Sequence, residues 1–352
     1  MIIRSRAPLR LGFAGGGTDL ETYSNISGGA VLNATVSMYA YCSIIPTDND
    51  KIRIYSYDNK NNLEIDSVPY IAPDGDKLIL HRGVYNRIVK DFNGGKPLSF
   101  IMSTSNDAPV GSGLGTSSTM IVAILEAFNK WLNLGLNDYQ KARLAYDIER
   151  KDLKLAGGKQ DQYSAVFGGF NFMEFKPDGN VLVNKLHLEK NCVNELECSM
   201  VLYYGGQSRK SADVQFELTK NIINRQIENT AQKKDTTISA LDALKQNAYD
   251  MKHYLLTGNL AAFIQAIRVG WENKKKTSSI VSNTELENTI NFAMANGAEA
   301  VKVSGAGGGG FLLLLCNPIN RQKLTDALKT LDGSVYSVKF SDSGAESWIT
   351  HY

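Results

Sequence analysis

Asp161 is the first of two acidic residues whose surroundings indicate chemistry. It lies in the segment GGKQDQ over residues 157–162, where two glycines precede polar amides and no periodicity is visible, so we expect a loop. A carboxylate in such a loop can accept a proton from a substrate hydroxyl. A single Asp in a turn can equally be a local cap, so this residue alone does not define a site.

Glu149 is the second, because it falls on the apolar face of a helix predicted over residues 137–155. The residues that share this face are Tyr139, Ala142, Ala145, Tyr146 and Leu153. An acid on an inward face must be paired or bind a cation. Two alternatives stay open: a Mg²⁺ ligand, or a boundary residue paired with Arg150 or Lys159.

A glycine- and serine-rich loop precedes a long predicted helix that starts near residue 117. A helix N-terminus offers unpaired N–H groups and the positive end of the helix dipole, and small residues let phosphate oxygens reach them. The hydroxyls can bind phosphate or Mg²⁺. The alternative is a capped helix after a flexible loop. The candidate phosphate-binding residues are Pro109, Gly111, Ser112, Gly113, Leu114, Gly115, Thr116, Ser117 and Ser118.

Two further glycine clusters flank this one in the sequence. Gly15, Gly16 and Gly17 follow a predicted strand, and Thr18 and Asp19 then supply a hydroxyl and a carboxylate suited to a polyol; a plain turn is the alternative. The third cluster, over 304–310, matches GxGxxG, but a strand-like apolar run follows where a dinucleotide fold needs a helix. We therefore expect it to approach a ligand or another backbone closely. No GxxxxGK[ST] sequence occurs, which excludes an ordinary P-loop ATPase.

The elements that must position these loops alternate between strand and helix, which predicts an α+β protein. Apolar and β-branched runs predict strands near residues 2–11, 30–45, 51–56, 98–103, 198–204, 299–303, 311–316 and 335–340. Helices are predicted near 78–92, 117–132, 137–155, 285–295 and 321–331. The length of 352 residues favours two domains, and we place the boundary near residue 190, giving 1–190 and 191–352.

Composition narrows the class of protein. The net charge is +2, from 38 basic and 36 acidic residues, which argues against a nucleic-acid-binding or membrane-surface protein. The four cysteines form no CxxC pair, and their scatter is typical of a reduced, cytoplasmic protein without a zinc site. No apolar run is long enough to span a membrane. Whether the protein is a monomer or a homodimer stays open.

Taken together, the three glycine clusters resemble the motifs of the GHMP kinase superfamily. The segments that carry the resemblance are APLRLGFAGGGTD over 7–19, PVGSGLGTSS over 109–118 and KVSGAGGGG over 302–310. The three segments occur in the order and with the wide spacing of the family motifs, and the resemblance extends over nearly the whole chain. The resemblance implies a ribosomal-protein-like N-terminal domain and a ferredoxin-like C-terminal domain, with ATP between them.

The resemblance also implies roles for individual residues. Asp161 would be the catalytic base, oriented by Arg10, and Ser117 with Glu149 would hold Mg²⁺. The ATP phosphates would lie on residues 109–118. Candidate contacts to the sugar, or to a phosphate on it, are Gly16, Gly17, Thr18, Asp19, Lys159, Arg209, Gly307 and Gly308.

Within the superfamily, the segments FAGGGTDL, GGKQDQYSAVFGGFN and SDSGAESW are most similar to the heptose 7-phosphate kinases. Those enzymes phosphorylate the anomeric hydroxyl, so the resemblance implies a sugar phosphate and ATP as partners. Fucose kinases are the alternative, and a non-catalytic nucleotide- and sugar-binding regulator is a third reading. Galactose kinases carry Glu-His where this chain has Gly16 and Gly17, which argues against galactose.

Overall fold

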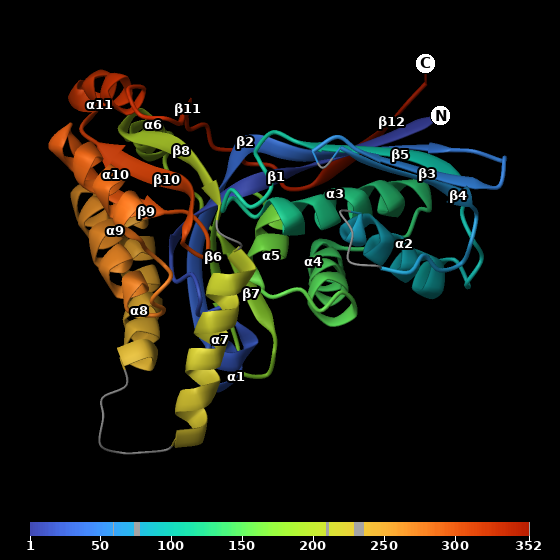
Figure 1. Ribbon diagram of the computed structural model, residues 1–352, viewed down its shortest axis with the longest axis horizontal. Helices are drawn as coiled ribbons and strands as arrows, with labels where there is room; N and C mark the ends of the chain where they lie inside the picture. Colours follow the sequence, from blue (N-terminus) through green and yellow to red (C-terminus); the bar gives the residue numbers. More distant parts are fainter. Residues whose placement is uncertain (59, 74–77, 209–210, 229–235, 352) are drawn as a thin grey trace.

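Two β-sheets and the helices packed on them make up the fold (Figure 1). The computed structural model describes residues 1–58, 60–73, 78–208, 211–228 and 236–351. None of the helices in these ranges is long and apolar enough to cross a membrane. The predicted α+β class is confirmed.

The first sheet has eight strands, in the order β12-β1-β2-β5-β3-β4, with β6 paired to β2 and β7 to β6. Alternate residues are buried over residues 2–7 of β1 and along β3, as expected for strands with one face on a core, whereas residues 7–11 of β1 are all buried. The strands are β1 (Ile2–Ala14), β2 (Gly29–Pro46), β3 (Lys51–Ser56), β4 (Asn61–Asp66), β5 (Phe100–Asn106), β6 (Phe170–Phe175), β7 (Val181–Lys185) and β12 (Glu346–Thr350).

Helices cover one face of this sheet and bury its largest core (Figure 1). They are α2 (Ile79–Phe92), α3 (Thr116–Trp131), α4 (Asp138–Tyr146), the π-helical turn η1 (Asp147–Asp152) and α5 (Gln160–Phe167). The central helix, α3, is buried around most of its circumference and packs on β1 and β2. Asn137 and Gln140 form a capping box at the start of α4. These elements carry most of the predicted chemistry.

The second sheet is antiparallel, in the order β11-β8-β10-β9. Its strands are β8 (Met200–Ser208), β9 (Ala298–Val303), β10 (Gly309–Cys316) and β11 (Ser334–Ser337). With helices between β8 and β9 and between β10 and β11, the connection is the ferredoxin-like βαββαβ pattern. The remaining helices are α1 (Glu21–Ser27), α6 (Lys190–Ser199), α7 (Ser211–Glu228), α8 (Thr236–Leu256), α9 (Leu260–Lys275), α10 (Thr284–Ala295), the 3₁₀ turn η2 (Pro318–Asn320) and α11 (Arg321–Leu328).

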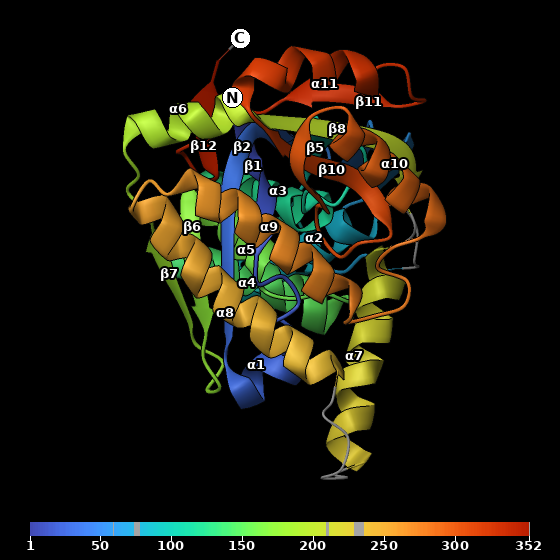
Figure 2. The same ribbon diagram turned by 90° about the vertical axis from the view of Figure 1, so that its left-hand side faces the viewer.

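The two halves share a hydrophobic core instead of meeting at a polar seam. Phe13 of β1 packs edge-on against Phe263 of α9, with ring centroids 5.5 Å apart, and Phe311 of β10 belongs to the same cluster. Helices α8 and α9 lie across the front of this region in Figure 2. The division near residue 190 therefore stays a proposal, and β12 crosses it by pairing antiparallel with β1.

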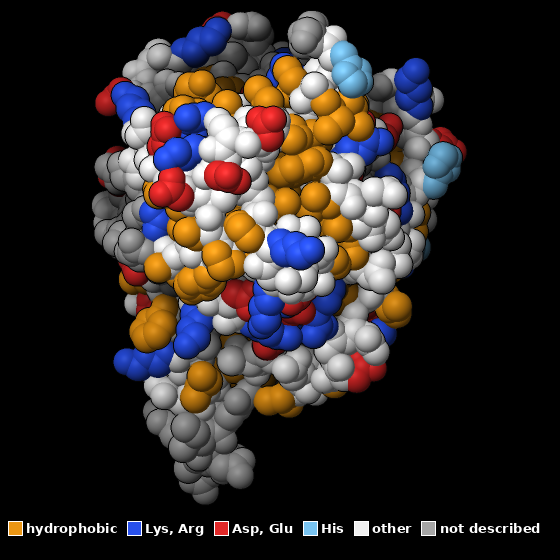
Figure 3. All heavy atoms as spheres, turned by 90° about the vertical axis from the view of Figure 1, so that its right-hand side faces the viewer, with side chains coloured by type: hydrophobic (Ala, Val, Ile, Leu, Met, Phe, Trp, Pro, Cys, Tyr) orange, Lys and Arg blue, Asp and Glu red, His pale blue; other side chains and the backbone are white. Residues whose placement is uncertain are grey.

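Two predictions about elements need correction. The helix predicted over 137–155 is not continuous, because the chain widens into the π-helical turn η1 after Tyr146. Asp161 is not in a loop but in the first turn of α5. The segment over residues 228–237 is charged and low in apolar residues, which predicts a loop or a solvated helix end; residues 229–235 of it lie outside the described residues. At the far end of the first sheet, acidic and basic side chains are interspersed with apolar ones (Figure 3).

Candidate active site

Arg10 and Asp161 form the centre of the site. Arg10 lies in the middle of β1 and is 4% exposed, and Asp161 projects from the first turn of α5. Nε and Nη2 of Arg10 are each 2.7 Å from Oδ1 of Asp161. The third nitrogen, Nη1, donates to the carbonyl of Gly113 at 2.6 Å. A carboxylate held this way is fixed in orientation, as a proton acceptor requires.

The predicted phosphate loop lines one side of a cavity of about 420 Å³ that opens beside this pair. Helix α3 begins after Gly115, which has φ +79°, and no side chain caps it. The uncapped helix end therefore leaves N–H donors and the positive end of its dipole at the cavity. From the predicted loop, the cavity is lined by Gly111, Gly113, Gly115, Thr116, Ser117 and Ser118.

Three residues of the predicted loop serve its structure and are not among the residues that line the cavity. Ser112 and Leu114 are fully buried, and Pro109 is exposed outside the lining. The Ser112 carbonyl accepts the N–H of Phe311 at 2.9 Å, and the Leu114 carbonyl accepts the N–H of Arg10 at 3.1 Å. These bonds anchor the loop between β1 and β10.

The third glycine cluster packs backbone to backbone against this loop. A side chain at Gly113 would lie 2.4 Å from the Ser304 carbonyl oxygen, and one at Gly310 would lie 2.4 Å from that of Ser112. The Ser304 hydroxyl also donates to the Gly113 carbonyl at 3.0 Å. The predicted close approach to another backbone is thus confirmed, and β10 follows the cluster where a dinucleotide fold would need a helix.

Glu149 is buried in the cavity wall, with 2% exposure, and lies on the π-helical turn. Its Oε2 accepts hydrogen bonds from Ser118 Oγ and from Gln162 Nε2, both at 2.6 Å, and Oε1 lies 3.3 Å from Arg150 Nη1. Glu149 therefore pairs with Arg150, as one alternative predicted, and it also lines the phosphate cavity. Its role as a Mg²⁺ ligand stays a prediction. Gln162 was not predicted; its signal was its position, one residue after Asp161.

This donor set suits Mg²⁺. The ion prefers oxygen ligands and is usually held by one or two carboxylates together with substrate phosphates. The Glu149 carboxylate and the Ser117 hydroxyl line the same cavity as the N-terminus of α3, and the Ser118 hydroxyl bonds directly to Glu149. The residues present therefore fit the ion at the place where phosphates would lie.

A second, smaller pocket adjoins the first across Asp161 and Arg10. The β1–α1 turn supplies Gly16, Gly17 and Asp19 to its wall. Asp19 is fixed there, because Oδ1 accepts the N–H of Gly17 and Oδ2 accepts the N–H of Gln160, both at 3.1 Å. Helix α7 closes the opposite side with Gln215.

Two lysines of the C-terminal half reach this region, and the sequence prediction missed both. Lys274 Nζ lines the small pocket and donates to the Gly16 carbonyl at 3.1 Å. Lys302 Nζ donates to the carbonyls of Gly12 and Phe13 at 2.8 and 2.9 Å. Burial lowers the pKa of Lys274 to about 8; burial, and secondarily the charges of Lys274 and Arg10, lower that of Lys302 to about 7.

Two of the predicted sugar contacts lie elsewhere. The Thr18 hydroxyl is fully buried and bonds to the carbonyls of Gly15 and Ala30 at 2.7 and 2.9 Å, so it closes the turn and does not face the pocket. Lys159 is buried beside Glu21, 3.5 Å away, and is absent from the pocket lining. Arg209 lies outside the described residues.

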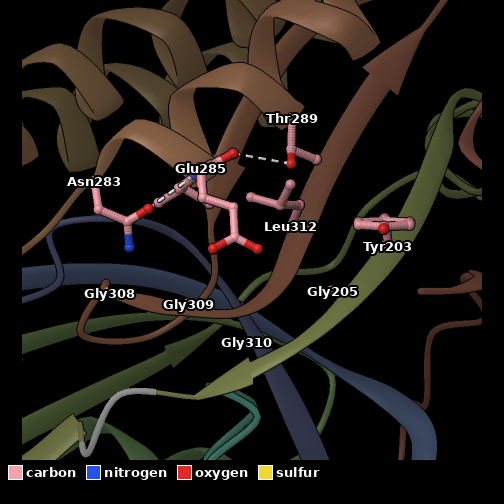
Figure 4. Close-up of a pocket in the computed structure, with 10 residues that line it drawn as sticks. Tyr203, Gly205, Asn283, Glu285, Thr289, Gly308, Gly309, Gly310 and Leu312 are labelled. Atoms are coloured by element: carbon pink, nitrogen blue, oxygen red, sulfur yellow. Dashed lines mark hydrogen bonds between the residues drawn. The ribbon is translucent and has the colours of Figure 1, made fainter. Parts of the chain in front are cut away.

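The residues of the third glycine cluster that line the cleft are not the predicted ones, Gly307 and Gly308. Gly305 and Ala306 line both pockets of the cleft. Gly307 instead approaches Val281, and the N–H of Gly308 donates to the Val281 carbonyl at 2.8 Å. Gly308 lines a separate hollow at the start of α10, where Figure 4 shows Glu285 and Tyr203 on opposite sides.

Comparison with known families identifies the class of protein to which this fold and cleft belong. Residues 79–169 match the family model "GHMP kinases N terminal domain" and residues 251–332 match "GHMP kinases C terminal". A D-glycero-alpha-D-manno-heptose 7-phosphate kinase from Campylobacter jejuni is 43% identical over 98% of both chains. The chain belongs to the GHMP kinase family.

Solved structures agree with this membership. A crystal structure described as a D-glycero-D-manno-heptose 1-phosphate kinase from Bacteroides thetaiotaomicron has a TM-score of 0.83 and 44% identity, over 99% of this chain and all of that one. A putative sugar kinase from Campylobacter jejuni has a TM-score of 0.81 and 42% identity, over 99% of this chain and 98% of that one. Lactococcus lactis galactokinase, at 17% identity, shares the fold, with a TM-score of 0.76 over 98% and 95% of the chains.

Proposed function

We propose that this GHMP kinase transfers the γ-phosphoryl group of ATP to the anomeric hydroxyl of D-glycero-D-manno-heptose 7-phosphate. The observation that carries the reaction type is the Arg10–Asp161 pair, which lies where the phosphate cavity and the small pocket meet. The sugar is supported by the relative from Campylobacter jejuni, whose name states that substrate.

The roles follow from the geometry. ATP phosphates lie at the N-terminus of α3, and the sugar occupies the pocket beside Asp19. Asp161 accepts the proton of the anomeric hydroxyl, whose oxygen forms the new bond to the γ-phosphorus while the bond to ADP breaks. Since transition states of this kind are loose, positioning and neutralisation of charge provide most of the catalysis. Arg10 holds the Asp161 carboxylate in position through two nitrogens of its guanidinium.

We assign Mg²⁺ to Ser117 and Glu149, where it would neutralise phosphate charge. Ser118 and Gln162 orient the Glu149 carboxylate by their hydrogen bonds. Lys159 and Thr18 are proposed to support the turn around Asp19 and not to touch the sugar. We also infer a cytoplasmic location, where ATP is available; all four cysteines are free thiols.

The experiment is a coupled ADP-release assay over a panel of heptose 7-phosphate, heptose, L-fucose and galactose. The proposal expects turnover that is highest with heptose 7-phosphate. Preferred use of L-fucose would favour the fucose kinase alternative. The relevant relative is an L-fucokinase/L-fucose-1-P guanylyltransferase from Bacteroides fragilis, 24% identical; this chain spans 34% of that protein. Nucleotide binding without turnover on any sugar would favour a regulator.

A further inference from the structure

The small pocket beside Asp161 contains four charged residues among its described lining: Arg10, Lys274, Asp19 and Asp161. Two of them are committed to each other. All three nitrogens of Arg10 donate within the protein, two of them to Asp161 and one to Gly113. This leaves Lys274 as the cation of that lining that can meet a ligand.

Lys274 has donors to spare. Its ammonium carries three N–H groups, and its one hydrogen bond within the described structure goes to the Gly16 carbonyl. Within the same ranges of the chain it forms no ion pair, although the charge of Asp19 acts on it. A side chain at Gly17 would lie 3.3 Å from Nζ, so the bare turn keeps the ammonium open to the pocket.

Asp19 has acceptors to spare on the same wall. Two backbone N–H groups, of Gly17 and Gln160, and the more distant Gln160 amide at 3.3 Å use part of its capacity. A carboxylate offers about four lone pairs, so positions remain for a ligand. Gly158 allows this placement, because a side chain there would lie 1.9 Å from Oδ2.

An ammonium that is desolvated and unpaired is costly to the fold, and its lowered pKa, about 8, expresses that cost. Lys302 adds to this cost, because the two ammonium groups repel each other, and the charge of Lys274 helps to lower the pKa of Lys302. The charge of Asp19 offsets part of this cost, but no ion pair with Lys274 is formed in the described structure. A ligand that presents oxygen acceptors to Lys274 would reduce the remaining cost.

We propose that Lys274 and Asp19 form a hydroxyl-binding pair that selects the acceptor sugar. The ammonium donates to the oxygen of one hydroxyl, and the carboxylate accepts the proton of the neighbouring hydroxyl. Vicinal hydroxyls present a donor and an acceptor side by side, so the pair reads a diol on the ring whose anomeric oxygen faces Asp161. The inference rests on the proposed function, because it requires the acceptor in this pocket.

The test is Lys274→Met, with Lys275→Met as the matched control. Lys275 is the next residue of α9 and pairs with Glu272 at 2.9 Å, outside the pocket. Losing a hydrogen bond from a charged donor should raise KM for the acceptor about 10- to 100-fold in Lys274→Met. KM for ATP should stay near the wild-type value. The thermal midpoint should not fall, because the variant removes a desolvated charge, and Lys275→Met should leave both KM values unchanged. An unchanged acceptor KM in Lys274→Met overturns the inference.

The chemistry that Lys274 recognises is separated by comparing heptose 7-phosphate with unphosphorylated heptose. A hydroxyl contact predicts the same fold loss for both sugars, whereas a larger loss with the phosphorylated sugar would make Lys274 a phosphate ligand and overturn the diol assignment. If the wild type prefers another sugar, the proposed function fails, and the same KM comparison with that sugar still decides the role of Lys274. If no sugar is turned over, both proposals fail.

Discussion

Arg10 and Asp161 are 151 residues apart in the chain, yet two nitrogens of one guanidinium lie 2.7 Å from a single carboxylate oxygen of the other. The contact joins the first strand of the large sheet to the first turn of α5. Because the remaining nitrogen, Nη1, donates a hydrogen bond to the Gly113 carbonyl, the same arginine also fixes the phosphate loop. Proton acceptor and phosphate site are therefore positioned by one side chain.

Asp161→Asn should reduce kcat by about two to four orders of magnitude, because the amide cannot accept the hydroxyl proton. The change keeps the size of the side chain but removes the anion that pairs with the buried Arg10, so the thermal midpoint should also fall. Activity is therefore compared at a temperature where both proteins are folded. The measurement is ADP release at saturating ATP and acceptor, with nucleotide affinity determined by calorimetry as the control. Near-normal turnover would remove Asp161 from the role of base.

Glu149→Gln should raise the Mg²⁺ concentration that gives half-maximal activity by about tenfold or more, since a neutral amide is a poor ligand for a hard cation. The control is Glu126→Gln, another buried acid, which pairs with Lys141 at 3.0 Å away from the cleft. That variant should lose about 3 kcal/mol of stability with an unchanged response to Mg²⁺. Identical Mg²⁺ titrations of Glu149→Gln and the wild type would contradict the assignment.

Gly113→Ala should weaken ATP binding and lower the thermal midpoint, because the new methyl group would lie 2.4 Å from the Ser304 carbonyl. Gly179→Ala is a matched control, since both glycines have φ +85° and a side chain at Gly179 would meet nothing within 4 Å. Each variant pays the conformational cost, about 1–2 kcal/mol. The excess loss in Gly113→Ala measures the contact between the loops. Equal losses of stability and unchanged ATP affinity would show that the loops can separate freely.

Lys302 should make the stability of the protein rise with pH. Its folded pKa, about 7, is lowered from 10.5, so the unfolded chain binds more protons between these values. Above pH 10.5 both states are neutral at this group and the folded state bears no cost from it. As the pH falls toward 7 the cost grows and the free energy of unfolding decreases; Lys274 acts in the same direction. Urea unfolding at pH 7, 8 and 9 should therefore give a flatter profile for Lys302→Met than for the wild type. Parallel profiles would contradict the lowered pKa.

The sequence predicted the residues whose type and local motif carry their role. Arg10, Asp19 and Asp161 meet in one cleft, as the resemblance implied, and α3 begins at the glycine loop. Local sequence could not assign the partners of the polar groups inside the fold. From its local sequence Thr18 is a candidate polyol ligand, but in the fold its hydroxyl donates to the carbonyl of Ala30, twelve residues further along the chain.

Lys274 was missed for a related reason. It lies in the run ENKKK, which is typical of a solvated helix end, and the Gly16 carbonyl that it binds is 258 residues away in the sequence. The π-helical turn around Glu149 was hidden as well, because a π turn has the apolar spacing of an interrupted α-helix. Periodicity predicted that Glu149 faces inward but not which donors it meets there.

The pairing of β12 with β1 has a consequence for biosynthesis. Residues 2–6 leave the ribosome before their neighbours in the sheet, residues 346–350, which lie far along the chain. Until residues 346–350 emerge, one edge of the nascent sheet stays open to pairing with other chains. Completion of the large sheet, and with it the final position of the strand that bears Arg10, therefore waits for the synthesis of β12.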